Sequence, residues 1–297
     1  MTTSTIYKKK TPLLFFFIPA FAFMALFLYY PFVVNIVNSF SKISGLGTAA
    51  DGFNTPWYEN YLKLFEDPNI LTALKNTLLL MLCTIVFQVG IALLLGLLVD
   101  RIGRGSQFFR TVYFFPIVIS ATALGLLFNL IFLYNGGMIN QLAEKVFGIT
   151  TLTDWKDEAH YFVTMLIPIM WQYVGFYFVI IVTGLNNISS EIYEAAEIDG
   201  ASGFKRTRYI TLPLLRNVLC TCLILAITGA LKVFDLPWVM FGNGIPMDQS
   251  WLTGTYMYNQ TFVRNDVDYG STIAVIIVVL GVVISRAANT AFKEKDY

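Results

Sequence analysis

The chain has 297 residues, of which 56% are hydrophobic and only 13% are charged, and its mean hydropathy is +0.64. A soluble domain usually carries about 25% charged residues, so this composition excludes an ordinary soluble protein and indicates lipid as the solvent for much of the chain. The net charge of +1 gives no bias towards nucleic acids or acidic substrates.

Six apolar segments are long enough to cross a bilayer, which takes about 20 residues in a helix. The first follows Lys8-Lys9-Lys10, as a signal sequence would, but its apolar run exceeds the roughly 7–15 residues typical of one. We therefore expect a retained helix and an all-α integral membrane protein with six transmembrane helices. The predicted spans are Leu13–Val37, Leu74–Val99, Phe108–Leu133, Phe162–Val182, Leu214–Leu231 and Gly270–Ala291.

Lys and Arg are unevenly divided between the two sets of connections. Most of the 20 lie in the N-terminal tail, the second-to-third connection, the connection 186–213 and the C-terminal end. The positive-inside rule places these segments in the cytoplasm. We therefore predict cytoplasmic tails over 1–12 and 293–297, a six-helix transmembrane domain over 13–292 between them, and long outer connections over 38–73, 134–161 and 232–269.

The inner connection 186–213 carries the most ordered pattern in the sequence, E-A-A-x3-G-x9-I-x-L-P. Ser189-Ser190 offers a helix N-cap, and Gly200 can take the positive φ that ends a helix. Ser202 can cap a second helix, and Pro213 should push Leu212 out of the α region. We predict a helix–turn–helix at the membrane surface that a partner could grip. The residues that define it are Glu194, Ala195, Ala196, Asp199, Gly200, Ile210, Leu212 and Pro213.

The sequence lacks the residues that enzymes and metal sites need. There is no phosphate-binding loop of the form GxxxxGK[ST], so the chain is not expected to bind ATP itself. Cys220 and Cys222 have no second pair or histidine to complete a metal site, and His160 is the only histidine. We therefore predict no catalytic residue, no metal site and no cofactor in this chain.

Polar and aromatic residues inside the spans are candidates for a solute path, because polar groups in a bilayer are costly unless they have a function. Tyr173 and Tyr177 are one helical turn apart and share a face. Two alternatives stay open, since Trp and Tyr also form interfacial belts and amides also join helices. Gln88 fits such a helix-joining role, and Asp235 could pair with Lys232. The candidates are Asn129, Gln172, Tyr173, Tyr177, Asp235, Trp238 and Asn259.

The E-A-A pattern resembles the cytoplasmic coupling loop, or EAA motif, of binding-protein-dependent ABC importer permeases. The resemblance covers most of the chain and includes Tyr30-Pro31, Phe109-Arg110-Thr111 and Phe234-Asp235. Asn243 and Ile245 depart from the Gly-Gly-Pro run of the family. The C-terminal end, Phe292–Tyr297, lacks the Gly-Ala-Val-Lys-Gly tail of G-like subunits, so the chain looks like the F-like subunit of a maltose-type permease.

This resemblance implies a permease subunit of an ATP-driven sugar or oligosaccharide importer in the bacterial inner membrane, with both termini cytoplasmic. It implies a G-like second permease, two ATPase subunits that bind ATP and Mg, and an extracytoplasmic solute-binding protein. Other solutes such as glycerol phosphate or a polyamine remain alternatives. A phosphate ester calls for Lys or Arg facing the path, and the sequence places none in mid-span. A secondary transporter or a membrane enzyme fits less well, because no inverted repeat, intramembrane charge pair or catalytic set is visible.

Overall fold

The computed structural model describes residues 11–102 and 106–292, and helices dominate them. The predicted all-α class is confirmed. In the described part of the chain, the only strands are β1 (Ser41–Lys42) and β2 (Gly52–Phe53), which pair antiparallel. The predicted tails lie almost wholly outside the described residues. The chain divides into two compact units, Met1–Glu66 with Met257–Ile276 and Asp67–Tyr256 with Ile277–Tyr297.

The first unit joins the N-terminal span to the start of the last helix by polar contacts. Ser39 Oγ lies 2.9 Å from Tyr61 Oη, and Thr272 Oγ1 donates to the carbonyl oxygen of Ser39. Lys63 Nζ lies 2.5 Å from Asp266 Oδ2. The helical elements of this unit are α1 (Thr11–Met24), η1 (Ala25–Tyr29), α2 (Tyr30–Asn38), α3 (Glu59–Glu66), η5 (Asn259–Val263) and the first part of α16 (Val267–Phe292).

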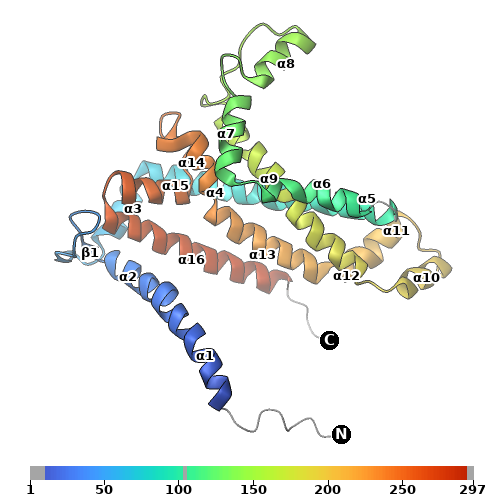
Figure 1. Cartoon of the computed structure of the whole chain (residues 1–297), viewed down its shortest axis with the longest axis horizontal. Helices are drawn as coiled ribbons and strands as arrows, with labels where there is room; N and C mark the ends of the chain where they lie inside the picture. Colours follow the sequence, from blue (N-terminus) through green and yellow to red (C-terminus); the bar gives the residue numbers. More distant parts are fainter. Residues whose placement is uncertain (1–10, 103–105, 293–297) are drawn as a thin grey trace. The chain divides into compact units, whose positions relative to one another are not determined.

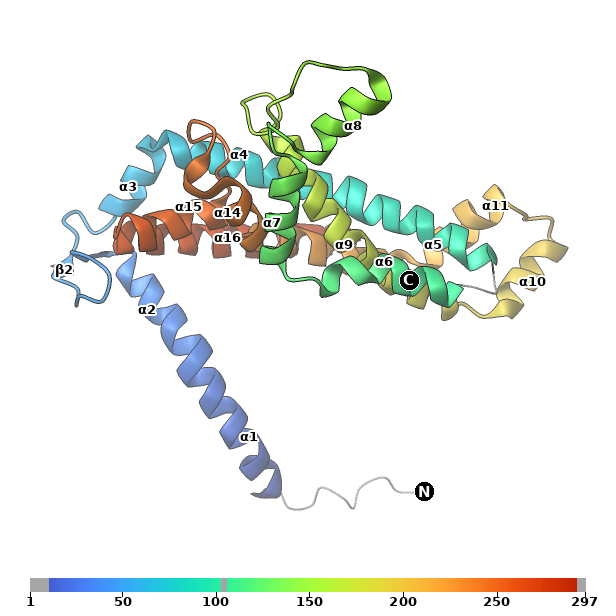
Figure 2. The same ribbon diagram turned by 45° about the horizontal axis from the view of Figure 1, so that its top comes forward.

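The second unit contains the remaining helices and the main hydrophobic cores (Figures 1 and 2). Its elements before the connection 186–213 are α4 (Pro68–Cys83), η2 (Thr84–Val89), α5 (Gly90–Ile102), α6 (Ser106–Val118), α7 (Ala121–Ile131), α8 (Met138–Phe147) and α9 (Tyr161–Asn186). Those that follow are α10 (Ser190–Ile198), α11 (Phe204–Arg206), η3 (Thr207–Thr211), α12 (Leu212–Leu214), α13 (Arg216–Lys232), α14 (Asp235–Phe241), η4 (Gly242–Gly244), α15 (Thr253–Tyr258, ending at the boundary between the units) and the rest of α16.

Five helical segments of the described chain are long and apolar enough to cross a membrane, and they match five of the six predicted spans. They cover Phe15–Asn38, Pro68–Val99, Tyr161–Asn186, Arg216–Phe241 and Val267–Thr290. The second begins before the predicted Leu74, because the Asp67 side chain accepts a hydrogen bond from the backbone N–H of Asn69 and caps the helix at Pro68.

The predicted third span, Phe108–Leu133, is not one continuous helix. It is a pair of helices, α6 and α7, bent by 91° at the break between Val118 and Ala121, which is the geometry of a broken span or of a re-entrant loop. Pro116 lacks a backbone N–H, and the chain leaves α6 with the backbone N–H of Ile119 bonded to the Pro116 carbonyl. Helix α7 then departs from α6 in a new direction towards α8 (Figure 2).

Helix α9 is the packing centre of the second unit, with α5 and α6 against it. At Gly175 an added Cβ would lie 1.7 Å from the backbone carbonyl oxygen of Tyr113 on α6. The two helix backbones therefore touch, as small residues permit between membrane helices. Phe178 and Ile181 on the same helix are fully buried in the core that α5, α9 and α13 share.

Candidate functional site

The coupling segment, defined here as residues 186–213, begins as its sequence predicts. Ser189 is the N-cap of α10, and its Oγ accepts a hydrogen bond from the backbone N–H of Glu191 at 3.3 Å. Glu191 lies in the first turn, where a carboxylate complements the positive end of the helix dipole. The predicted first helix and its cap are therefore confirmed.

Gly200 ends α10 with a φ of +77°, as predicted. The backbone N–H of Ala201 donates to the Ala196 carbonyl, and that of Gly200 donates to the Glu197 carbonyl. This is the Schellman arrangement, in which the residue after the helix must be left-handed. No atom lies within 4 Å of a Cβ built on Gly200, so backbone conformation rather than space demands glycine there.

Two details of the predicted second helix are wrong. Gly203, with a φ of +57° and no side-chain cap, precedes α11 in place of Ser202. Leu212 is α-helical, with φ −64° and ψ −43°, although Pro213 follows it. The reason is the π turn η3, where the backbone N–H of Leu212 bonds to the Thr207 carbonyl and the wider turn makes room for the proline ring.

Most of the predicted motif faces outwards. Among the apolar residues of α10, Ala196 is buried, whereas Ile192 is 41% and Ile198 is 87% exposed. Phe204 and Tyr209, on the second half of the segment, are 79% and 72% exposed. Exposed apolar residues beside Glu194 and Asp199 leave the segment with a mixed surface that no other part of the described chain covers.

The spans on either side of the coupling segment touch at the end where they enter it. A Cβ added to Gly184 on α9 would lie 2.8 Å from Val218 Cγ2 on α13. Leu215 at the start of α13 is 1% exposed and lies in the same core as Leu185. The segment is therefore anchored in tight packing at both ends, and Figure 1 shows α10 and α11 extending beyond α9 and α13.

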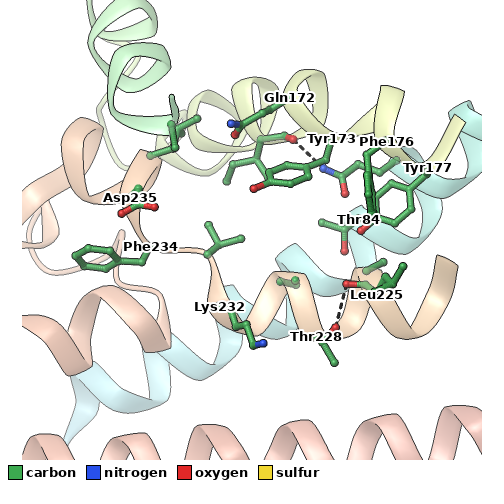
Figure 3. Close-up of a pocket in the computed structure, with 18 residues that line it drawn as sticks. Thr84, Gln172, Tyr173, Phe176, Tyr177, Leu225, Thr228, Lys232, Phe234 and Asp235 are labelled. Carbon is green, nitrogen blue, oxygen red and sulfur yellow. Dashed lines mark hydrogen bonds between the residues drawn. The ribbon is translucent and has the colours of Figure 1, made fainter. Parts of the chain in front are cut away.

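A cavity of about 350 Å³ opens between helices of the second unit (Figure 3). Its wall is contributed by η2, α7, α9, α13 and α14 and the residues that join α13 to α14. Its aromatic members are Tyr173, Phe176, Tyr177 and Phe234, and its neutral polar members are Thr84, Gln88, Gln172 and Thr228. Aromatic rings and hydrogen-bonding groups therefore both line the space.

The two glutamines of the cavity are held by backbone carbonyls. Gln88 Nε2 donates to the Ile169 carbonyl of α9 at 2.8 Å, which confirms its predicted helix-joining role. Gln172 Nε2 donates to the Ile119 carbonyl at the break between α6 and α7 at 3.4 Å. In each case the bonded amide nitrogen fixes the position of the side chain.

Lys232 and Asp235 both line the cavity, yet among the described residues no ion pair joins them. The ion pair that the sequence left open as an alternative is therefore not formed. Helix α13 ends at Lys232 and α14 begins at Asp235, and Val233 between them is extended with a ψ of 120°. The interruption separates two charges that a continuous helix would bring together at i, i+3.

The structure brings together four of the seven predicted solute candidates, Gln172, Tyr173, Tyr177 and Asp235. Asn129 instead donates to the Val239 carbonyl and accepts from Lys156 Nζ at 2.6 Å, so it joins α7 to α14 and to the connection between α8 and α9. Burial lowers the pKa of the Lys156 amine. Trp238 stacks on Phe234 with ring centroids 5.7 Å apart and does not line the cavity.

Asn259, the seventh candidate, lies in the other unit and is 4% exposed. Sequence reasoning missed Thr84, Phe176, Thr228, Lys232 and Phe234 as lining residues. Spacing could have found Thr84, because it lies four positions before Gln88, just as Tyr173 lies four positions before Tyr177. No group of His, Cys, Asp and Glu able to hold a metal ion occurs among the described residues.

Long apolar helices, a polar-lined cavity between them and an exposed segment outside them define a transmembrane transport subunit. Residues 88–295 match the family described as "Binding-protein-dependent transport system inner membrane component". The chain belongs to this family, as the motif resemblance predicted.

Three curated relatives align along nearly their whole length. The probable ABC transporter permease protein YurN of Bacillus subtilis is 32% identical over 94% of both chains. The arabinooligosaccharides transport system permease protein AraP of the same species is 29% identical over 94% of this chain and 87% of its own. The lactose transport system permease protein LacF of Rhizobium radiobacter is 30% identical over 94% and 93%. The chain is therefore a permease subunit of an ABC importer, and it is not itself the ATPase.

The fold also matches solved structures. A chain of a bacterial ABC transporter involved in the import of the acidic polysaccharide alginate superposes with a TM-score of 0.83, at 19% identity, over 97% of both chains. A second match, with a TM-score of 0.81 at 18% identity over 95% of this chain and 93% of the other, comes from that type of transporter in complex with an alginate pentasaccharide-bound periplasmic protein. An importer of this family works with a binding protein and an ATPase as separate subunits.

Proposed function

We propose that this permease carries a sugar or oligosaccharide and that the cavity of Figure 3 forms part of its path. The single observation that carries the proposal is the cavity wall, which combines four aromatic rings with amides, hydroxyls, one lysine and one carboxylate. Sugars present apolar ring faces that stack on aromatic side chains and hydroxyls that both donate and accept hydrogen bonds. The names of LacF and AraP, which specify lactose and arabinooligosaccharides, support the same class.

Lys232 bears on whether the solute is a neutral sugar or a charged molecule. A phosphate ester calls for Lys or Arg facing the path, and Lys232, although it lies at the end of α13 and not in mid-span, lines the cavity. Asp235 on the same wall offsets its charge, so the wall as a whole favours a neutral solute over an anion such as glycerol phosphate or a cationic polyamine.

The coupling segment is the proposed docking surface for the ATPase subunit. ATP and Mg would be bound by two such subunits, and their closure would push on α10 and, through the spans that the segment joins, tilt the wall of the cavity. The exposed side chains of Ile198, Phe204 and Tyr209 support this role, because apolar groups left uncovered in one chain mark an interaction site. The segment would then lie in the cytoplasm, with both termini on the same side of a bacterial inner membrane.

The remaining proposed partners of this subunit are a second permease and a solute-binding protein. A second, G-like permease would complete the path as a heterodimer, and an extracytoplasmic binding protein would deliver the solute. The excess of Lys and Arg on the side of the coupling segment supports this orientation.

Reconstitution in liposomes tests the proposal. The chain, its second permease, the ATPase and the cognate binding protein should give ATP-dependent uptake of a neutral oligosaccharide, and glycerol phosphate and polyamines should not compete. Competition by glycerol phosphate at comparable concentration would reassign the cargo to phosphate esters. The purified chain alone should hydrolyse no ATP, and hydrolysis without partners would overturn the division of labour.

A further inference from the structure

Tyr193 lies at the elbow of the coupling segment and contacts both of its halves. The residue belongs to α10, immediately before Glu194. Arg206 of α11 places its guanidinium carbon 5.0 Å from the centre of the Tyr193 ring. The Tyr193 hydroxyl also lies 3.5 Å from Thr211 Oγ1 in η3. A single side chain of the first helix therefore meets two successive elements of the second half.

Arg206 strengthens the same junction from the other side. Its Nη1 lies 3.7 Å from Glu197 Oε1, one turn beyond Tyr193 on α10. The Arg206 side chain is 27% exposed, whereas that of Glu197 is 64% exposed, so the tyrosine ring accounts for more of the junction than the ion pair does. Thr211, which completes the junction, is 4% exposed.

The backbone between the two halves supplies little stiffness of its own. Residues 199–203 connect α10 to α11, and both Gly200 and Gly203 take positive φ there. Glycine has more accessible backbone conformations than any other residue, so two of them in one short connection permit bending. Side-chain contacts across the connection must then hold the angle between α10 and the elements that lead to α13.

We infer that Tyr193 and Arg206 form a joint that keeps the coupling segment rigid, so that a displacement of α10 reaches η3 and α13 instead of being lost in the connection. The inference rests on the proposed docking of the ATPase. It separates two roles within one segment. Ile198, Phe204 and Tyr209 face outwards, whereas Tyr193 and Arg206 face each other and act as positioning residues.

The test measures solute molecules transported per ATP hydrolysed in liposomes that contain the complete importer and its binding protein. In Tyr193→Leu and Arg206→Met this ratio should fall about fivefold, the effect of losing a partly shielded cation–π contact, while ATP hydrolysis stays responsive to the binding protein. Tyr193→Phe keeps the ring, and Arg206→Lys keeps the cation, so both should retain most of the ratio.

Arg208 provides a matched control. Its guanidinium carbon lies 5.9 Å from the ring of Tyr209, and both side chains are exposed. This contact joins two neighbouring residues of η3 and does not involve α10. Because Arg208 belongs to the proposed docking surface, Arg208→Met can lower uptake and ATP hydrolysis together, but it should leave the ratio between them unchanged. An equal fall in Arg208→Met, or a parallel loss of uptake and hydrolysis at constant ratio in Arg206→Met, would overturn the joint.

The failure of the joint is distinguishable from the failure of the proposed function. A wild-type importer without ATP-dependent uptake contradicts the proposed function, whatever the variants do. If Tyr193→Leu does not assemble, the outcome is decided by Arg206→Met against Arg208→Met, which both leave the tyrosine in place.

Discussion

The coupling segment and the cavity both adjoin helices α9 and α13, but they are built in opposite ways. The segment consists of neighbouring residues whose backbone conformation is set locally, by a cap at Ser189 and a left-handed turn at Gly200. The cavity draws its side chains from positions as distant as Thr84 and Leu236, which meet only through packing. We expect the segment to be sensitive to backbone changes and the cavity to be sensitive to the chemistry of single side chains.

The largest effect should come from the close contact that supports the cavity wall. In Gly175→Ala the new Cβ would collide with the backbone of Tyr113, so α6 and α9 would have to separate, at a cost of about 3 kcal/mol or more. The yield of folded protein from detergent, judged by a monodisperse elution profile, should drop severely. The matched variant Gly229→Ala has only the Tyr177 hydroxyl near, at 3.9 Å, and should fold normally; equal yields would contradict this close approach of the two helices.

The next effect tests whether the coupling segment is sensitive to a change of backbone conformation. Gly200→Val places a β-branched residue at a φ of +77°, which costs about 1–2 kcal/mol and should distort the end of α10. Uptake should fall by about tenfold or more while the protein still inserts in the membrane. Gly200→Asn should keep most of the uptake, because asparagine tolerates this conformation and no neighbouring atom crowds the position. Equal activity in both variants would show that the turn does not matter.

The third effect tests whether the cavity is sensitive to the chemistry of single side chains. Asp235→Asn and Tyr173→Leu remove a charge and a ring from the cavity wall without a backbone change, and each should raise the solute concentration for half-maximal uptake by about tenfold. Asn129→Ala alters a residue outside the cavity, so it should change stability and leave that concentration unaltered. A larger shift in Asn129→Ala than in Asp235→Asn would remove the cavity from the path.

The smallest effect concerns Lys156, outside the spans. Burial lowers its pKa below the ordinary value of 10.5, so the folded chain releases this proton at lower pH than the unfolded chain does. At neutral pH the amine is charged in both states and the folded state bears the full desolvation cost. As pH rises through the folded pKa towards 10.5, the wild type should gain stability relative to Lys156→Met. Thermal unfolding midpoints of both proteins between about pH 8 and 10 would reveal the trend, and a constant difference would contradict it.

The contrast between the two regions also explains what the sequence could predict. The capping at Ser189 and the turn at Gly200 follow from local chemistry, and both predictions hold. The helical state of Leu212 before a proline depends on a π turn, which no residue pattern announces. Likewise Lys232 and Asp235 look like an ion pair in sequence, and only the extended Val233 separates them.

The sequence does not distinguish polar residues of the spans that line the cavity from those that only join helices. Asn129 and Gln172 are both amides within apolar segments, and nothing in their surroundings distinguishes them in the sequence. In the fold, the amide of Asn129 donates to the Val239 carbonyl and accepts from Lys156. Gln172 lines the cavity, and its amide nitrogen donates to a carbonyl at the break between α6 and α7. Whether Asn129 or Gln172 lines the cavity depends on the 91° bend after Pro116.

That bend has a consequence for how the protein is made. Helix α7 has 11 residues and is about 16 Å long, too short to cross the hydrocarbon core by itself. The straight segment Phe108–Leu133 is long enough to be recognised as it leaves the ribosome, whereas α9, the helix against which α6 packs, is synthesised later. We therefore expect insertion to precede bending, so that truncating the chain before α9 should leave this segment as an ordinary straight span.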